Sequence, residues 1–208
     1  MNNIHCLKCS GSNYIRPGVP CPDCMPDVLE KTPIVQGIPV QYQGVKFDRK
    51  FLPEKEQAKY GVFMEELLST IISDRHYYQK NLLICSRPNS GKTIWAYTLI
   101  AHLISKGMEV PTLRDIIEVR QLMSSYENKD ENILWSTARC AIIKIPRDIQ
   151  PWVLESIPSI IERRVRASGF TIFLYGGTKE DLLQTDRFEK LKYVIGNGSY
   201  NTLKIESF

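Results

Sequence analysis

The fold is decided by the stretch Asn81-Leu-Leu-Ile-Cys-Ser-Arg-Pro-Asn-Ser-Gly-Lys-Thr93, an apolar run followed by a loop that ends in Gly-Lys-Thr. The apolar part, residues 81–86, is typical of a buried parallel strand. Residues 94–104, which follow the loop, have the apolar spacing of a helix. Strand, loop and helix in this order predict a phosphate-binding loop, in which backbone N–H groups and the helix N-terminus hold phosphates.

The candidate nucleotide-binding residues lie in this loop. In the motif the lysine contacts the outer phosphates and the next hydroxyl binds magnesium, which gives these roles to Lys92 and Thr93. Ser86 stands where the motif usually begins with glycine, and Asn89 where a second glycine is common. Asparagine tolerates the left-handed region, so the loop can still form. The alternative is an inherited loop that only packs. The candidate set is Ser86, Asn89, Ser90, Gly91, Lys92, Thr93 and Ile94.

Strands and helices alternate on both sides of the loop. Apolar residues at three- and four-residue spacing predict a helix over 54–73. Beyond the loop we predict strands at 110–113, 141–145 and 171–175, with helices at 115–126 and 152–167. This alternation predicts an α/β fold with a parallel sheet and helices on both of its faces.

The first 24 residues hold four of the six cysteines, Cys6, Cys9, Cys21 and Cys24, as two Cys-x-x-Cys pairs. Two such turns facing each other supply the tetrahedral thiolate shell of a structural zinc. A segment this short cannot build a core, so the metal would supply its folding energy. Two disulfides or a redox pair are the alternatives, and His5 could replace one ligand. We favour a zinc-ribbon-like module.

The remaining two cysteines, Cys85 and Cys140, lie in apolar runs and are predicted to be buried, unreactive side chains. Residues 25–53 contain four prolines and no sustained periodicity, which indicates an extended connector. We therefore divide the chain into a zinc module (1–28), a linker (29–53) and a P-loop ATPase-like domain (54–208).

The composition is that of an ordinary globular protein. The net charge of +4 permits contact with nucleic acid without requiring it. No apolar run is long enough to cross a membrane, and the N-terminus lacks the apolar region of a secretion signal. These features predict a cytoplasmic protein that does not bind membranes.

Several segments, in order, resemble those of one group of ATPases. Ile38-Pro-Val-Gln-Tyr42 with Phe47-Asp48 is similar to the segment before its first helix, and Val110-Pro-Thr-Leu-Arg-Asp-Ile-Ile117 to its second strand and next helix. Ile160-Ile-Glu-Arg-Arg-Val165 is similar to its helix ending in an arginine pair, and Thr185-Asp-Arg-Phe-Glu-Lys-Leu191 to the segment with its arginine finger. From about residue 38 onward, the chain thus resembles the DnaC/DnaI-type bacterial helicase loaders and the related IstB transposition ATPases, which are AAA+ proteins.

The resemblance implies ATP or ADP and magnesium as ligands, a replicative helicase as partner and single-stranded DNA as a further partner. It implies catalytic roles for Lys92, Thr93 and Arg187, with a surface salt bridge as the alternative role of Arg187. It also implies a homo- or hetero-oligomer in the cytoplasm of a bacterium or a phage-infected host. In DnaI-like loaders a zinc-bearing N-terminal domain contacts the helicase.

The sequence departs from the family pattern where hydrolysis takes place. The family's Walker B strand ends in two acids, whereas this strand reads Ala-Ile-Ile-Lys-Ile-Pro146, and Asp148 is the nearest acid. The fourth strand ends at Tyr175-Gly-Gly177 instead of near a sensor asparagine. Because such carboxylates position the metal and the water, we predict impaired hydrolysis.

Three functions remain open from the sequence. The first is a replication accessory that binds a helicase and uses nucleotide as a conformational ligand. The second is a non-enzymatic interaction or inhibitor module on a degenerate ATPase scaffold. The third is an IstB-like transposition ATPase, which the small net charge disfavours. The arginines at 163, 164 and 166 either bind DNA phosphates or form a solvated helix face, and we favour the solvated face.

Overall fold

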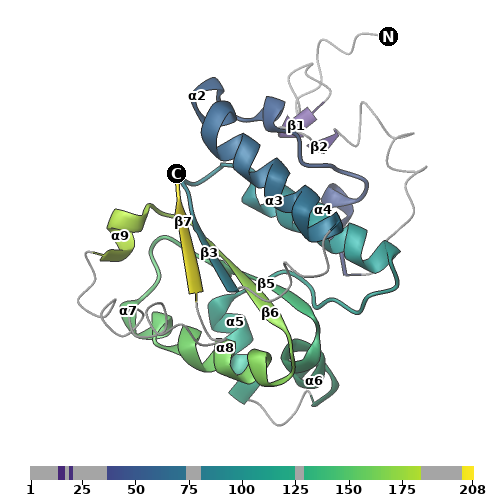
Figure 1. Ribbon diagram of the computed structural model, residues 1–208, viewed down its shortest axis with the longest axis vertical. Helices are drawn as coiled ribbons and strands as arrows, with labels where there is room; N and C mark the ends of the chain where they lie inside the picture. The colour runs from purple at the N-terminus through teal and green to yellow at the C-terminus, as the bar shows by residue number, and fades with distance from the viewer. Residues whose placement is uncertain (1–13, 17–18, 21–36, 74–80, 125–128, 184–202) are drawn as a thin grey trace. The chain divides into compact units, whose positions relative to one another are not determined.

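The computed structural model describes residues 14–16, 19–20, 37–73, 81–124, 129–183 and 203–208 (Figure 1). The chain forms two compact units, the first made of Met1–Ile72 and Gly91–Lys106, the second of Ser73–Ser90 and Gly107–Phe208. The cysteines of the predicted zinc module and Arg187 lie outside the described residues. Among the helices that are described, none is long and apolar enough to span a membrane.

The second unit is built on a five-stranded sheet with the order β4-β5-β6-β3-β7, in which all neighbouring strands are parallel. Its strands are β3 (Asn81–Cys85), β4 (Arg114–Asp115), β5 (Cys140–Ile145), β6 (Phe170–Tyr175) and β7 (Leu203–Ser207). The predicted parallel α/β fold is confirmed. The predicted strand at 110–113 is wrong, because the pairing with β5 begins at Arg114, and β7 was not predicted.

The three central strands are buried along almost their whole length. Every residue of β3 and β6 is buried, and in β5 only Lys144 is partly exposed. A strand covered on both faces needs a continuous apolar run, which is why these segments lack the alternation of a half-exposed strand. Asn81 and Thr171 are buried polar residues of these strands. Asn81 accepts a hydrogen bond from the Thr171 N–H through Oδ1 at 2.9 Å and so fixes β3 beside β6.

Helices α5 (Ile116–Ser124), α7 (Pro151–Leu154) and α8 (Ser156–Arg166) lie on one face of the sheet (Figure 1). The unit also contains α6 (Lys129–Thr137), which was not predicted, and α9 (Lys179–Leu183). The helix expected at 152–167 is present but is interrupted at Glu155, between α7 and α8.

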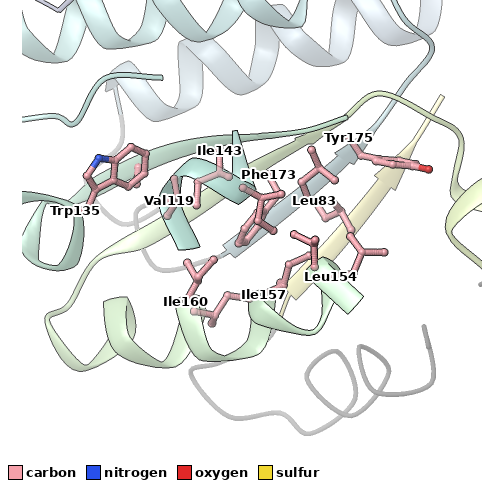
Figure 2. Packing of buried hydrophobic residues seen from close by; sticks show 14 of the residues in the cluster. Leu83, Val119, Trp135, Ile143, Leu154, Ile157, Ile160, Phe173 and Tyr175 are labelled. Carbon is pink, nitrogen blue, oxygen red and sulfur yellow. The ribbon is translucent and has the colours of Figure 1, made fainter. Parts of the chain in front are cut away.

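The core of the second unit lies between the sheet and these helices, as Figure 2 shows. Leu83, Ile143 and Phe173 come from the three central strands, while Ile157 and Ile160 come from α8. All five are at most 2% exposed. Both free cysteines, Cys85 and Cys140, are fully buried, as predicted, and burial raises the pKa of the Cys140 thiol to about 12.

Arg164 of α8 contradicts the prediction of either a solvated or a DNA-binding face. Its side chain is fully buried. The guanidinium donates from Nε to Thr171 Oγ1 (2.9 Å), from Nη2 to Ala138 O (2.7 Å) and Phe170 O (2.9 Å), and from Nη1 to Trp135 O. Arg164 therefore donates to backbone carbonyls in the last turn of α6, directly after it and at the start of β6. Arg163 and Arg166 are exposed.

The described part of the first unit consists mainly of helices. Its main helices are α3 (Val62–Ser73) and α4 (Lys92–Ser105). Helix α3 is preceded by η1 (Val40–Tyr42), η2 (Arg49–Phe51), α2 (Glu54–Glu56) and the short π-helix η3 (Gln57–Gly61). The short strands β1 (Tyr14–Arg16) and β2 (Val19–Pro20) pair antiparallel. They fall in the sequence between the two Cys-x-x-Cys pairs.

The indole of Trp95 connects the two main helices of this unit. It is fully buried in α4 and donates from Nε1 to the Met64 carbonyl of α3 at 2.7 Å. Residues 37–53 also pack into the unit, because Ile38, Val45, Phe47 and Leu52 are buried. Phe47 N–H donates to Thr98 Oγ1 of α4 at 2.9 Å. The segment before α2 thus contributes apolar side chains to the same core.

Candidate functional site

The loop between β3 and α4 adopts the turns that a phosphate-binding loop requires. Asn89 has a φ of 64° and Gly91 a φ of 73°, so both lie in the left-handed region. The backbone of Asn89 thus adopts the conformation for which glycine is common, since asparagine enters this region more readily than most residues. Arg87, Pro88 and Asn89 are exposed at the turn.

Ser86, at the first position of the motif, has a structural role of its own. Its side chain is 2% exposed, and its Oγ lies 2.8 Å from Ser90 Oγ. Its N–H donates to the Tyr175 carbonyl of β6 at 3.4 Å. The φ of Ser86 is not positive, so the position does not need glycine. The hydroxyl pair closes the base of the loop where a glycine would leave space.

Gly91 begins α4 and belongs to the first unit. With its φ of 73° it occupies the N-cap position, and its carbonyl accepts from the Trp95 N–H at 2.9 Å. A Cβ at this position would lie 3.1 Å from Phe47 Cε2 and 3.3 Å from Leu52 Cδ2. Both the backbone conformation and the packing therefore favour glycine at this position.

Lys92, Thr93 and Ile94 form the first turn of α4, and all three are partly exposed. Their N–H groups are among those that have no partner within a helix, and the helix dipole is positive here. The chain passes from the second unit to the first between Ser90 and Gly91. The candidate nucleotide-binding residues are therefore contiguous in sequence and divided between the two units.

The three central strands of the second unit end at the same level. Cys85 of β3 is in register with Tyr175 of β6, which is in register with Ile145 of β5. In open α/β sheets this carboxyl edge is where ligands bind. The residues that leave β5 at the edge are Pro146, Arg147 and Asp148, of which the last two are exposed. β5 itself carries no carboxylate, and its only ionisable side chain near the edge is the partly exposed Lys144.

Tyr175 and two glycines occupy the end of β6. The Tyr175 hydroxyl lies 3.4 Å from the Arg147 carbonyl, and the Gly176 N–H donates to the Ile145 carbonyl at 2.9 Å. A Cβ on Gly177 would lie 2.7 Å from the Tyr175 ring, so this glycine makes room for the ring. Burial, followed by the nearby Asp181, raises the pKa of the Tyr175 phenol. The side chain is thus a neutral hydrogen-bonding group at neutral pH.

Asp181 of α9 and Arg147 form an ion pair at the same edge. Arg147 Nη2 lies 3.5 Å from Asp181 Oδ1, while Asp181 Oδ2 accepts the Thr178 N–H at 2.8 Å. The Asp181 N–H donates in return to Thr178 Oγ1 at 3.2 Å. This reciprocal arrangement is a capping box. The backbone hydrogen bond from Thr178, assisted by Arg147, holds the pKa of Asp181 below its usual value.

Sequence reasoning did not identify Arg147, Thr178 or Asp181 as site residues. The Thr-x-x-Asp spacing of residues 178–181 is a recognisable capping signal. No local pattern points to Arg147, because its position at the edge depends on the register of β5. Within the described ranges, no group of three or more His, Cys, Asp or Glu side chains could hold a metal ion.

The fold and the loop together define an α/β unit with a parallel sheet, in which a loop with two left-handed residues follows β3. No family model matches the chain, and no curated protein does. Among solved structures it is similar to a candidate primosome component from Streptococcus pyogenes serotype M3, with a TM-score of 0.56 and 15% identity over 86% of this chain and 94% of that one.

Two further solved structures are similar over smaller parts. One is DnaI, with a TM-score of 0.48 and 12% identity over 70% of this chain and 79% of that one. The other is AMPPCP-bound DnaA from Aquifex aeolicus, with a TM-score of 0.46 and 13% identity over 78% of this chain and 50% of that one. At these identities the similarity to the Streptococcus protein shows a shared fold and does not show a shared activity.

Proposed function

We propose that this chain is a DNA replication accessory protein whose phosphate loop binds ATP or ADP as a conformational ligand, with little hydrolysis by the chain alone. The observation that carries the proposal is a combination of two features. The loop after β3 keeps the left-handed turns of a phosphate-binding loop at Asn89 and Gly91, while the adjoining edge of the sheet lacks Walker B acids on β5.

Binding would use the parts of the loop that remain. The N–H groups at the start of α4 would meet the phosphates, and Lys92 would contact the outer phosphates. Thr93 keeps the hydroxyl that the motif uses for a metal. The contacts from backbone N–H groups require a loop conformation and not a particular side chain at positions 86 and 89, which is why Ser86 and Asn89 are compatible with binding.

Hydrolysis would be slow because the groups that position a metal and a water are replaced. The end of β5 is followed by Pro146 and Arg147, and β6 ends at Tyr175 in place of a sensor asparagine. Phosphoryl transfer depends almost entirely on such positioning. Arg187 remains a proposed arginine finger, which would act only on the nucleotide of a neighbouring subunit in an oligomer.

The partners we propose are a replicative helicase and single-stranded DNA. The support is the fold shared with a candidate primosome component, together with the resemblance to helicase loaders. The zinc module at Cys6, Cys9, Cys21 and Cys24 would be the surface that contacts the helicase. Failure to co-purify with the replicative helicase of its own host or genome would argue against this role.

A second candidate function is a non-enzymatic module that bridges or inhibits replication proteins on an ATPase scaffold. The basic and apolar end of β5 favours it. An IstB-like role in transposition would instead predict strong, salt-sensitive binding to duplex DNA. Weak binding to duplex DNA at low salt would contradict the IstB-like role.

Calorimetric titration with ATP tests the proposal. We expect saturable binding that Lys92→Ala weakens at least about tenfold, because the lysine contact to phosphate is lost. Lys106→Ala, at the other end of α4, removes the same charge and is the matched control, which should bind like the unchanged protein. No heat with either the unchanged protein or the variants, and no shift in melting temperature, would favour the scaffold function.

A further inference from the structure

We propose that an exposed patch on the second unit binds a partner protein through a segment that combines carboxylates with apolar side chains. The patch, here called the arginine–tryptophan patch, consists of Ile117 and Arg120 of α5, Trp152 of α7 and Arg163 of α8. All four residues belong to the second unit, and none belongs to the phosphate loop or to the cysteine pairs. The inference therefore goes beyond the proposed function and does not depend on nucleotide binding.

Contacts between neighbouring helices connect the members of the patch. The guanidinium of Arg120 lies over the Trp152 ring, with Cζ 4.5 Å from the ring centroid. Ile117 is three residues before Arg120 and thus lies on the same face of α5. About one turn further along α5, Arg163 donates from Nη1 to the Met123 carbonyl at 3.1 Å. The patch therefore follows α5 and its contacts with α7 and α8, which cover the same face of the sheet (Figure 1).

Trp152 differs from the other two tryptophans of the chain in its exposure. Its side chain is 46% exposed, whereas Trp95 and Trp135 are fully buried. Ile117, on the other side of Arg120, is 40% exposed. Covering a tryptophan ring removes a large apolar surface from water, and tryptophan and arginine are enriched at the energetic centres of protein interfaces. The patch thus offers an apolar anchor point beside a cationic side chain.

The two arginines give the patch a positive charge that the described residues do not neutralise. The ion pairs of the described residues use other arginines, namely Arg49, Arg114, Arg147 and Arg166. Arg120 contacts an aromatic ring instead, and Arg163 donates to the Met123 carbonyl and, at 2.9 Å, to Asn132 Oδ1. Neither has a carboxylate partner in the part of the chain that the structure describes. A carboxylate of a partner can therefore pair with each arginine without displacing an existing ion pair.

The acidic residues around the patch favour a protein over a nucleic acid as its partner. Exposed glutamates at positions 118, 155 and 162 lie within three residues of Arg120, Trp152 and Arg163 in the sequence. The backbone of a nucleic acid carries a negative charge at every phosphate, so these carboxylates would repel it. A protein segment can place single carboxylates opposite the arginines and an apolar side chain against the tryptophan ring. The arrangement of charges therefore fits a segment of mixed apolar and acidic character.

Selection from a phage-displayed library of random peptides tests the proposal, with the intact chain as the target. We expect enriched sequences that combine aromatic residues or leucine with Asp or Glu. Synthetic peptides of these sequences, made without tryptophan, are then titrated against the chain and its variants. Trp152→Ala should weaken binding at least about tenfold, as truncation at the centre of an interface does. Arg120→Gln should weaken it at least about threefold, because a charged hydrogen bond is lost.

The matched controls are Phe51→Ala and Arg139→Gln, which change an exposed aromatic residue and an exposed arginine that do not belong to the patch. Both variants should bind the peptides like the unchanged protein. A general loss of affinity in all four variants would contradict a specific role of the patch.

Iodide quenching of tryptophan fluorescence gives a readout at the patch itself. Because Trp95 and Trp135 are fully buried, the quencher reaches mainly Trp152. A bound peptide should therefore reduce the quenching. Trp152→Phe should remove most of the quenchable signal while it retains an aromatic ring, so it reports on the patch even where Trp152→Ala fails to fold.

Several results would overturn the proposal. Failure to enrich any peptide would do so, as would enrichment of peptides without acidic residues, or affinities that Trp152→Ala and Arg120→Gln leave unchanged. Oligo-dT that protects Trp152 from iodide more strongly than any selected peptide would identify a nucleic-acid surface instead. None of these results bears on ATP binding by the loop, which the titration of Lys92→Ala tests separately.

Discussion

At the scale of single residues, Arg164 has a role that is unusual for a charged side chain. It lies fully buried in the second unit, and its described partners are one hydroxyl and three backbone carbonyls, with no carboxylate among them. Burial lowers its pKa to about 10, so it stays charged at neutral pH. The carbonyl dipoles at the end of α6 and the start of β6 stabilise that charge.

Replacing this arginine should therefore destabilise the second unit. Arg164→Met fills the space but removes the hydrogen bonds that the guanidinium donates to the carbonyls of Trp135, Ala138 and Phe170, which should cost about 2–4 kcal/mol. Urea unfolding followed by circular dichroism measures the change. Arg166→Met, an exposed neighbour, should stay within about 0.5 kcal/mol of the unchanged protein. Equal stability of the two variants would mean that the buried hydrogen bonds contribute no net stability.

Some residues were predictable from sequence and others were not, for physical reasons. The burial of Cys85 and Cys140 follows from their apolar neighbours, and the left-handed turn at Asn89 follows from asparagine's tolerance of that region. The burial of Arg164 was not predicted, because it lies in sequence among the charged residues at 163 and 166. Its position seven residues after Ile157, four after Ile160 and three after Ile161 places it on the apolar stripe of α8. That spacing is the signal that would have identified it.

At the scale of elements, the sequence predicts long, strongly patterned segments well and short ones poorly. β3, β5, β6 and α4 are near their expected places, because each is a long apolar or amphipathic run. β4 has only two residues, and its position depends on the register with β5 rather than on its own sequence. β7 pairs with β3, far away in the chain, and nothing local marks it as a strand.

The capping box of α9 gives an element-scale prediction about pH. Asp181 has a pKa lowered in the folded state, mainly by the Thr178 N–H. Its stabilising contribution is therefore present above its unfolded pKa of about 3.8 and is lost as the pH falls through the lower, folded value. We expect Asp181→Asn to lower the melting temperature near neutral pH, with a difference that shrinks as the pH falls through 3.8. Thermal unfolding of both proteins over this range measures it, and a difference that does not change with pH would contradict the assigned cause.

At the scale of the whole molecule, the fold class was predictable from alternation alone, whereas the division into two units was not. Strand β3, the loop that follows it and helix α4 are continuous in sequence. Even so, α4 belongs to the unit that contains residues 1–72, while β3 belongs to the unit that contains the sheet. Hydrophobic patterning says which residues are buried but not against which partner. The surroundings of Arg147 at the carboxyl edge of the sheet could not be predicted from local patterning either, because its neighbours come from β6 and α9.

The zinc module remains a prediction, and thiol counting can test it. With metal bound, none of the six cysteines should react rapidly with a maleimide. After chelation, the four at positions 6, 9, 21 and 24 should react, while Cys85 and Cys140 stay protected by burial until the chain is denatured. Elemental analysis should find one zinc per chain. Thiols that a chelator does not release but a reductant does would indicate disulfides instead.

The pairing of β7 with β3 has a consequence for biosynthesis. Residues 203–207 complete the sheet beside residues 81–85, so until they leave the ribosome one side of the phosphate-loop strand has no hydrogen-bonding partner. Long-range parallel pairing of this kind forms slowly, and an open strand edge invites aggregation while it lasts. The strand at residues 81–85 would therefore be synthesised long before the strand that completes the sheet beside it. A chaperone or an early partner that shields this edge would improve the yield of folded protein.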